Sequence, residues 1–392
     1  MKHGRQQHRT RRSAALAAAV LLVLQTTAPA WAGSREQARR LHDRLAGVPP
    51  SDVVLTQMQA DIDAGNPSAA AYLAMNNSNF YNVTLKNLVA PWTNRDQSVF
   101  VPLNDYTATI IGMVRDDVDF STVLSADLLY VANTAGAPAY SPANNNHYQY
   151  LDDNNVDLKS ALQPAAQSTL LGIPSAATAG VLTSRAAAAA FFINGTNRAM
   201  FRFTLINHLC RDMEQVQDGS LPPDRVRQDV SRSPGGDSRV FLNSCITCHA
   251  GMDPMAQAFA YYNFDTTATQ LMYTEGQVQP KYLINSNNFK SGYVTVDNHW
   301  DNRWRQGPNS VIGFDGTLTG SGTGAKSLGQ ELARSDGFAQ CQVEKVFKAV
   351  CFRTPGNAAD RAAVSTIKGT FKSSGYKMKQ VFADTAVYCM GS

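Results

Sequence analysis

Residues 241–250 read Phe-Leu-Asn-Ser-Cys-Ile-Thr-Cys-His-Ala, and this stretch contains one complete CxxCH motif. Two cysteines at this spacing, Cys245 and Cys248, can each form a thioether with one vinyl group of a haem, and His249 can then bind the iron. The motif therefore predicts one covalent c-type haem, attached at Cys245 and Cys248, with His249 as the proximal ligand.

Other uses of a CxxC pair fit this chain less well. A redox-active dithiol is expected beside a βαβ unit and does not require the histidine. A zinc site needs further ligands, but the chain after residue 32 contains no second CxxC pair and no HxxxH pair. A disulfide across two residues would be strained. We therefore favour haem attachment.

The residues that follow the motif resemble those of a known family. Met252-Asp253-Pro254 and Asn263-Phe264-Asp265 are similar to the CxxCH…MDP…NFD signature of planctomycete-type secreted cytochrome c-like modules, which have no assigned physiological role. Residues 198–209 and 338–353 resemble helical segments on either side of that signature. The resemblance implies an exported haem protein.

The chain also departs from that family pattern. Met255-Ala256 stands where the family has Leu-Gly, and Tyr262 replaces a glutamate. Residues 266–310 are much longer than the family linker. We therefore expect any function that the family carries downstream of its NFD element to be altered in this chain.

The first 32 residues have the pattern of an export signal. Five basic residues precede an apolar stretch at residues 14–25, and Ala30-Trp31-Ala32 is a small-x-small cleavage site. Without the five basic residues the net charge falls from +4 to −1, so charge gives no argument for a nucleic-acid partner. We expect a periplasmic or secreted protein with no integral membrane segment after signal cleavage.

Helical spacing of apolar residues recurs along the chain and predicts a mainly α fold. We expect bundle-like helical domains with long ordered loops that enclose a single haem. The predicted division, after a signal peptide at residues 1–32, is an N-terminal helical domain at 33–214, a linker at 215–238, a haem segment with an insertion at 239–326, and a C-terminal helical module at 327–392 that packs on the haem segment.

Four cysteines lie outside the motif, at positions 210, 341, 351 and 389. In an oxidising compartment they can form up to two disulfides, with three possible pairings. Cys341 and Cys351 are expected on one helix about 15 Å apart, which is too far for a bond between them. We expect Cys389 to pair with one of them and Cys210 to be free or bonded to the other.

A low-spin electron carrier needs a second axial ligand, which is usually methionine or histidine. Met272, in an irregular segment, and His299, in the insertion, are nearly equal candidates. An iron without a sixth ligand is the third alternative, and it would permit peroxide or oxygen chemistry. The sequence leaves these three open.

Other methionines and histidines are expected in structural positions. Met252 and Met255 lie on the helix of the motif and are expected to pack in the core, because methionine commonly fills gaps there. His208 is on an apolar helix and is expected to be a core residue. His42 and His147 are expected at the surface.

Three functions are consistent with these features. The first is an exported electron carrier that exchanges electrons with redox partner proteins. The second is a peroxidase- or oxygenase-type enzyme with an open distal site, and the third is a binding or assembly subunit with a structural haem. Arg303 and Arg305 are candidates for pairing with haem propionates, since the guanidinium fork suits carboxylates; surface exposure is the simpler expectation for either.

Overall fold

The computed structural model describes residues 33–283 and 289–391, so the predicted signal peptide at residues 1–32 lies outside the described part. Helices account for 58% of the residues and strands for 7%, which confirms the mainly α class. Within the described ranges, no helix is long and apolar enough to cross a membrane.

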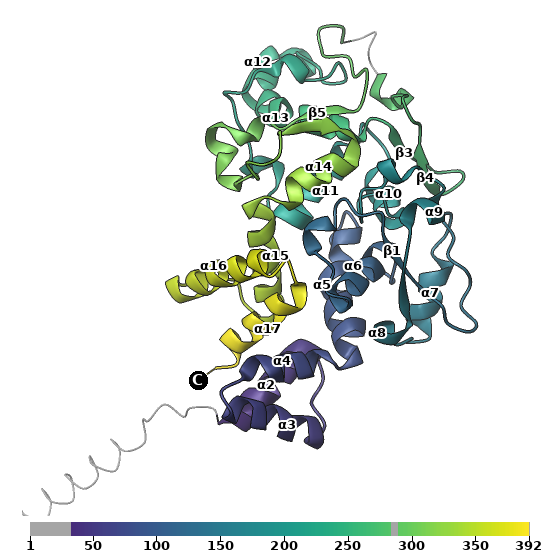
Figure 1. Cartoon of the computed structure of the whole chain (residues 1–392). Helices are drawn as coiled ribbons and strands as arrows, with labels where there is room; N and C mark the ends of the chain where they lie inside the picture. The colour runs from purple at the N-terminus through teal and green to yellow at the C-terminus, as the bar shows by residue number, and fades with distance from the viewer. Residues whose placement is uncertain (1–32, 284–288, 392) are drawn as a thin grey trace, which may run out of the picture.

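The elements are arranged along the chain as in Figure 1. The α-helices are α2 (Ser34–Ala46), α3 (Asp52–Asp63), α4 (Pro67–Met75), α5 (Lys86–Val89), α6 (Asp105–Arg115), α7 (Asn146–Asp153), α8 (Leu158–Ala161), α9 (Gln167–Leu171), α10 (Arg185–Phe191), α11 (Arg198–Thr204), α12 (Ser238–Val240), α13 (Ile246–Ala256), α14 (Gly324–Ala333), α15 (Asp336–Cys351), α16 (Ala358–Ser373) and α17 (Met378–Cys389). The strands form three antiparallel pairs: β1 (Leu129–Ala132) with β2 (Leu162–Ala165), β3 (Tyr262–Asp265) with β4 (Gln270–Tyr273), and β5 (His299–Asp301) with β6 (Ser321–Thr323).

Helix α6 lies in the main core, and every residue from Asp105 to Val114 is buried. Its N-terminus is capped by Asn104, whose side chain accepts a hydrogen bond from the backbone of Thr107. Strand β1 and helices α5 and α10 pack around it. A helix buried on all sides is consistent with its almost wholly apolar and small side chains.

The C-terminal helices pack against the N-terminal helices. Helices α15, α16 and α17 pack on each other, α17 also packs on α4, and α15 also packs on α2, as Figure 1 shows for the yellow and purple segments. Helix α14 packs on the turn at Gln257–Phe259 that follows the motif helix. Ser335 ends the run of α14 and starts a separate helix, α15, by accepting a hydrogen bond from the backbone of Phe338.

Three predicted α-helices contain a π-helical segment, at Phe80–Leu85, Leu205–Leu209 and Phe241–Cys245. A π turn inserts an extra residue and so rotates the helix face that follows it. The last of these segments ends at the first cysteine of the CxxCH motif. The second of these segments ends at Leu209, and Cys210 after it adopts a left-handed conformation with φ 53°.

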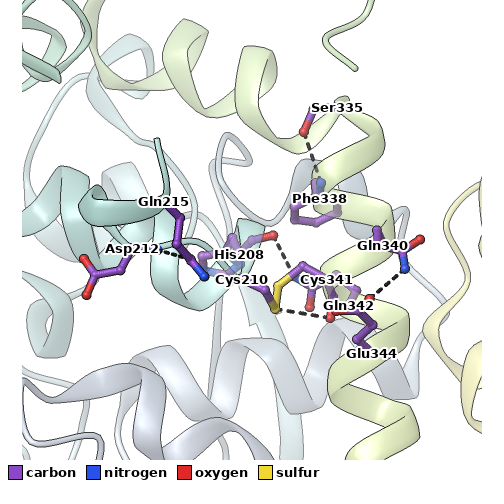
Figure 2. Close-up of a disulfide and its surroundings, with 10 residues drawn as sticks. All are labelled: His208, Cys210, Asp212, Gln215, Ser335, Phe338, Gln340, Cys341, Gln342 and Glu344. Atoms are coloured by element: carbon purple, nitrogen blue, oxygen red, sulfur yellow. Dashed lines mark hydrogen bonds between the residues drawn. A yellow bond between two sulfur atoms is a disulfide. The ribbon is translucent and has the colours of Figure 1, made fainter. Parts of the chain in front are cut away.

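The four cysteines outside the motif form two disulfides, Cys210–Cys341 and Cys351–Cys389. The prediction that Cys341 and Cys351 share a helix without bonding each other is confirmed, since both lie on α15. Figure 2 shows the first disulfide, which joins the end of the segment carrying His208 to α15. Together the two bonds fix α15 at both ends.

Three histidines outside the motif, at positions 42, 147 and 208, are structural. His208 is buried as predicted, and its Nε2 lies 2.7 Å from the Tyr106 hydroxyl. Burial lowers the pKa of His208 to about 3, so the ring is neutral. The predictions for His42 and His147 were wrong: both are 2% exposed. Their Nδ1 atoms lie 2.7 Å from the carbonyl oxygens of Val48 and Pro138, which compensates for burial of the rings.

Candidate functional site

The CxxCH motif lies on one face of a continuous helix. Cys245 ends the π-helical segment, and Cys248 and His249 lie in the first turns of α13. Residues three and four apart on a helix are neighbours on its surface, so the two thiols and the imidazole lie together. All three side chains are partly exposed. Cys245 and Cys248 are free thiols, although the other four cysteines are bonded in pairs.

The turns of α13 that follow the motif are fixed in the core, and every residue from Ala250 to Ala256 is buried. A Cβ atom at Gly251 would lie 2.2 Å from Nε1 of Trp304, so only glycine permits this contact. Met252 and Met255 are buried, which confirms their predicted packing role. Since Gly251 is two residues after His249, Trp304 packs roughly opposite the imidazole and leaves the imidazole's face free.

The ring orientation of His249 is set by a carboxylate on the same helix. Its Nδ1 atom lies 3.2 Å from Oδ1 of Asp253, which is buried. Nδ1–H therefore donates to Asp253, and the lone pair of Nε2 points away from it. A histidine that binds a metal through Nε2 commonly donates its other ring N–H to a carboxylate in this way.

Arg198 of α11 holds this carboxylate in place. Its Nε and Nη2 atoms donate to Asp253 at 2.7 and 2.8 Å, and its Nη1 and Nη2 atoms donate to Asp229 at 2.6 and 2.9 Å. Burial raises the pKa of Asp253, but Arg198 and Arg227 outweigh it and hold that pKa well below its usual value. Asp253 is thus a carboxylate acceptor for the imidazole.

Arg227 completes the polar cluster behind His249. It is 1% exposed, its backbone N–H donates to Oδ2 of Asp253 at 3.3 Å, and its Nη2 donates to the Thr196 hydroxyl at 2.7 Å. Its guanidinium lies 4.7 Å from the ring centre of Tyr282. Arg227 and Asp229 come from residues 215–238, which the sequence predicted to be a polar linker. No local pattern identifies them, because their partners are distant in sequence.

The turn that carries the motif exposes apolar side chains. Val240 is 42% exposed and Leu242 is 57% exposed, whereas Phe241 between them is buried. Exposed apolar side chains in the turns next to two free thiols provide surface that a flat apolar group can cover. These residues, together with the free Nε2 of His249, fit the attachment of a c-type haem.

The two predicted sixth ligands lie on different hairpins. Met272 is on β4, opposite Asn263 of β3, and this hairpin packs on α10. His299 is on β5, which packs on α13, and its Nε2 lies 3.4 Å from Oδ1 of Asp301. Among the residues that the structure describes, neither candidate makes a hydrogen bond or an ion pair with the motif. Their role as ligands stays a prediction.

Both arginines considered for propionates already have carboxylate partners. Arg303 makes two hydrogen bonds to Asp224, and Arg305 makes two to Glu331. The pairs hold the insertion against the segment before the motif and against α14. A propionate at either arginine would have to compete with these bidentate pairs.

The alternative chemistries of CxxC find little to support them. The described strands are all in antiparallel two-stranded sheets, without the βαβ surround of a redox dithiol. In the described part of the chain, no group of three or more His, Cys, Asp or Glu side chains is placed to hold a metal ion by itself.

Neither a protein-family model nor a curated protein nor a solved structure matches this chain.

Proposed function

We propose that this chain is an exported electron carrier with one covalently attached c-type haem. The observation that carries the proposal is the helix face on which Cys245, Cys248 and His249 lie together, with two free thiols and with Nδ1 of His249 bound to a buried carboxylate. The resemblance to planctomycete-type secreted cytochrome c-like modules supports export and covalent haem attachment.

Each residue of the site has a defined task in this proposal. Cys245 and Cys248 hold the haem through thioethers, and Nε2 of His249 is the proximal ligand. When bound, the haem iron accepts and releases one electron. Asp253 keeps the proton on Nδ1 and makes the imidazole a stronger donor, while Arg198 keeps Asp253 charged and oriented.

A periplasmic or secreted location and redox partner proteins belong to the same proposal. The two disulfides support an oxidising compartment, where such bonds persist. With a single CxxCH motif in the chain, the electrons must come from and go to other molecules.

An enzyme of peroxidase or oxygenase type, with an open distal site, is the second candidate. It is favoured by the hairpin that carries Met272, whose main helix contact is with α10 rather than with the motif helix α13. The ligand state of the iron separates the two functions.

The spectrum of the purified ferric protein tests the proposal. We expect that protein expressed with a c-type haem maturation system keeps one haem after denaturation and shows low-spin iron, with a sixth ligand from Met272 or His299. High-spin iron that reacts with peroxide would favour the enzyme. A protein without covalent haem under these conditions would contradict both.

Asp253→Asn is expected to raise the reduction potential of the haem. Asparagine can still accept a hydrogen bond from Nδ1 but carries no charge, so His249 becomes a weaker donor and Fe(III) is less favoured. Spectroelectrochemical titration measures the change, and each tenfold increase in the Fe(II)/Fe(III) ratio equals ~59 mV. Asp229→Asn is the matched control, because Asp229 contacts Arg198 but not His249. An equal shift in both variants would contradict a role through the imidazole.

A further inference from the structure

A cavity of about 590 Å³ lies away from the motif, between the end of α2, helix α5 with the turn after it, and the last turns of α15. Its size is in the range of small-molecule sites, which extends from roughly 300 to 1,000 Å³. None of the residues proposed to attach or orient the haem lines it. The cavity therefore needs a separate explanation.

One side of the cavity is cationic. Lys345 and Lys348 of α15 and Arg44 of α2 line it, and the acidic residue among its lining side chains is Asp43. The Lys345 ammonium lies 4.6 Å from the ring centre of Trp92 and makes no ion pair with a carboxylate in the described part of the chain. A half-buried ammonium without a counter-ion is costly, because burial disfavours its charge.

The remaining wall is apolar and aromatic. Trp92 and Leu88 line it from the segment before α6, and Val83 and Phe352 line it at its mouth. Phe352 follows α15 in a left-handed conformation with φ 55° and is 72% exposed. Arg44 lies 5.7 Å from the centre of the Phe352 ring and donates to the carbonyl oxygen of Cys389. The ring is thus held beside a guanidinium at the entrance.

We propose that this cavity binds a small amphipathic anion, with its carboxylate or sulfonate at Lys345 and its ring or short chain between Trp92 and Phe352. The anion supplies the counter-ion that Lys345 lacks, and its apolar part covers the exposed side chains at the mouth. A neutral ligand of the same shape lacks the first of these interactions. The proposal does not depend on the haem.

Calorimetric titration of the mature protein with 2-naphthoate tests the site. We expect saturable binding, binding of the neutral 2-naphthamide at least about tenfold weaker, and a similar loss for naphthoate in Lys345→Met, since each change removes a charge-assisted hydrogen bond. Methionine preserves the apolar stem over Trp92. Lys368→Met, on α16 and outside the cavity, is the control and should bind as the unmodified protein does.

A second variant keeps the proposal testable if Lys345→Met does not fold. Phe352→Ala changes an exposed side chain, so it leaves the core intact and is expected to weaken naphthoate binding severalfold through lost ring contact. Equal binding of the acid and the amide would overturn the proposal. Naphthoate affinity unchanged in Lys345→Met or in Phe352→Ala would overturn it too.

The pH dependence of binding gives an independent readout. Burial and Lys348 lower the pKa of Lys345 to about 8, so we expect naphthoate affinity to fall as the pH rises through that value. The other titratable or charged groups that face Lys345 are Asp43 and Arg44 on α2 and His208 at the end of the π-helical segment.

Discussion

A variant with both Cys245→Ser and Cys248→Ser will carry no covalent haem, whereas the unmodified protein will carry one. Serine hydroxyls do not form thioethers with the vinyl groups, so the haem is lost when the chain is denatured. We expect the variant to fold, because both side chains are partly exposed and neither belongs to a disulfide. The measurement is the intact mass and the optical spectrum after denaturation, with both proteins produced in cells that contain a c-type haem maturation system.

The other cysteine pairs provide the matched control. Cys210→Ser with Cys341→Ser removes two cysteines as well, but from a disulfide outside the motif, and should leave the covalent haem in place while lowering stability by about 2–4 kcal/mol. His249→Ala separates attachment from ligation, since it keeps both thiols and removes the proximal imidazole. Covalent haem in the double serine variant would refute attachment at the motif.

The residues that could be identified from the sequence are those whose role depends on near neighbours. Cys341 and Cys351 could be assigned to one helix because helical spacing fixes their separation, and α15 contains both. Met252 and Met255 could be assigned to the core because methionine commonly fills core gaps and both follow the motif on the same helix. The mainly α class follows from the same local periodicity.

The residues that could not be identified from the sequence are those whose role depends on partners distant along the chain. Asp253 lies four residues after His249, so helical spacing could have brought these two together, but its ion pair with Arg198 joins residues 55 apart. Arg227 and Asp229 lie in a stretch rich in proline, glycine and charge, which is typical of exposed linkers. Tertiary ion pairs leave no periodic signal, so local pattern alone could not bring them to the site.

His147 is a residue whose local sequence led to a wrong prediction of its burial. Its neighbours are asparagines, which favour loops, and this led to the expectation of a surface position. In the structure its Nδ1 lies 2.7 Å from the Pro138 carbonyl and its Nε2 accepts from the backbone N–H of Ala132. The imidazole serves as a hydrogen-bonding bridge between two backbone segments, which composition does not predict.

Arg198→Met is expected to lower the free energy of unfolding by about 3–5 kcal/mol, as removal of one partner from a buried ion pair does. Arg198 joins two carboxylates, Asp253 and Asp229, of which the first has a fully buried side chain. Methionine leaves both carboxylates close together with Arg227 as the remaining cation nearby. Urea denaturation of the unmodified and variant proteins measures the difference.

Arg202→Met, on the same stretch of helix, is the matched control. Arg202 also makes a bidentate pair, with Asp212, but the two side chains are 50% and 36% exposed. Exposed pairs contribute roughly 0–1 kcal/mol, so this substitution should have a small effect. If Arg198→Met is no more destabilising than Arg202→Met, the buried cluster does not hold Asp253 in place.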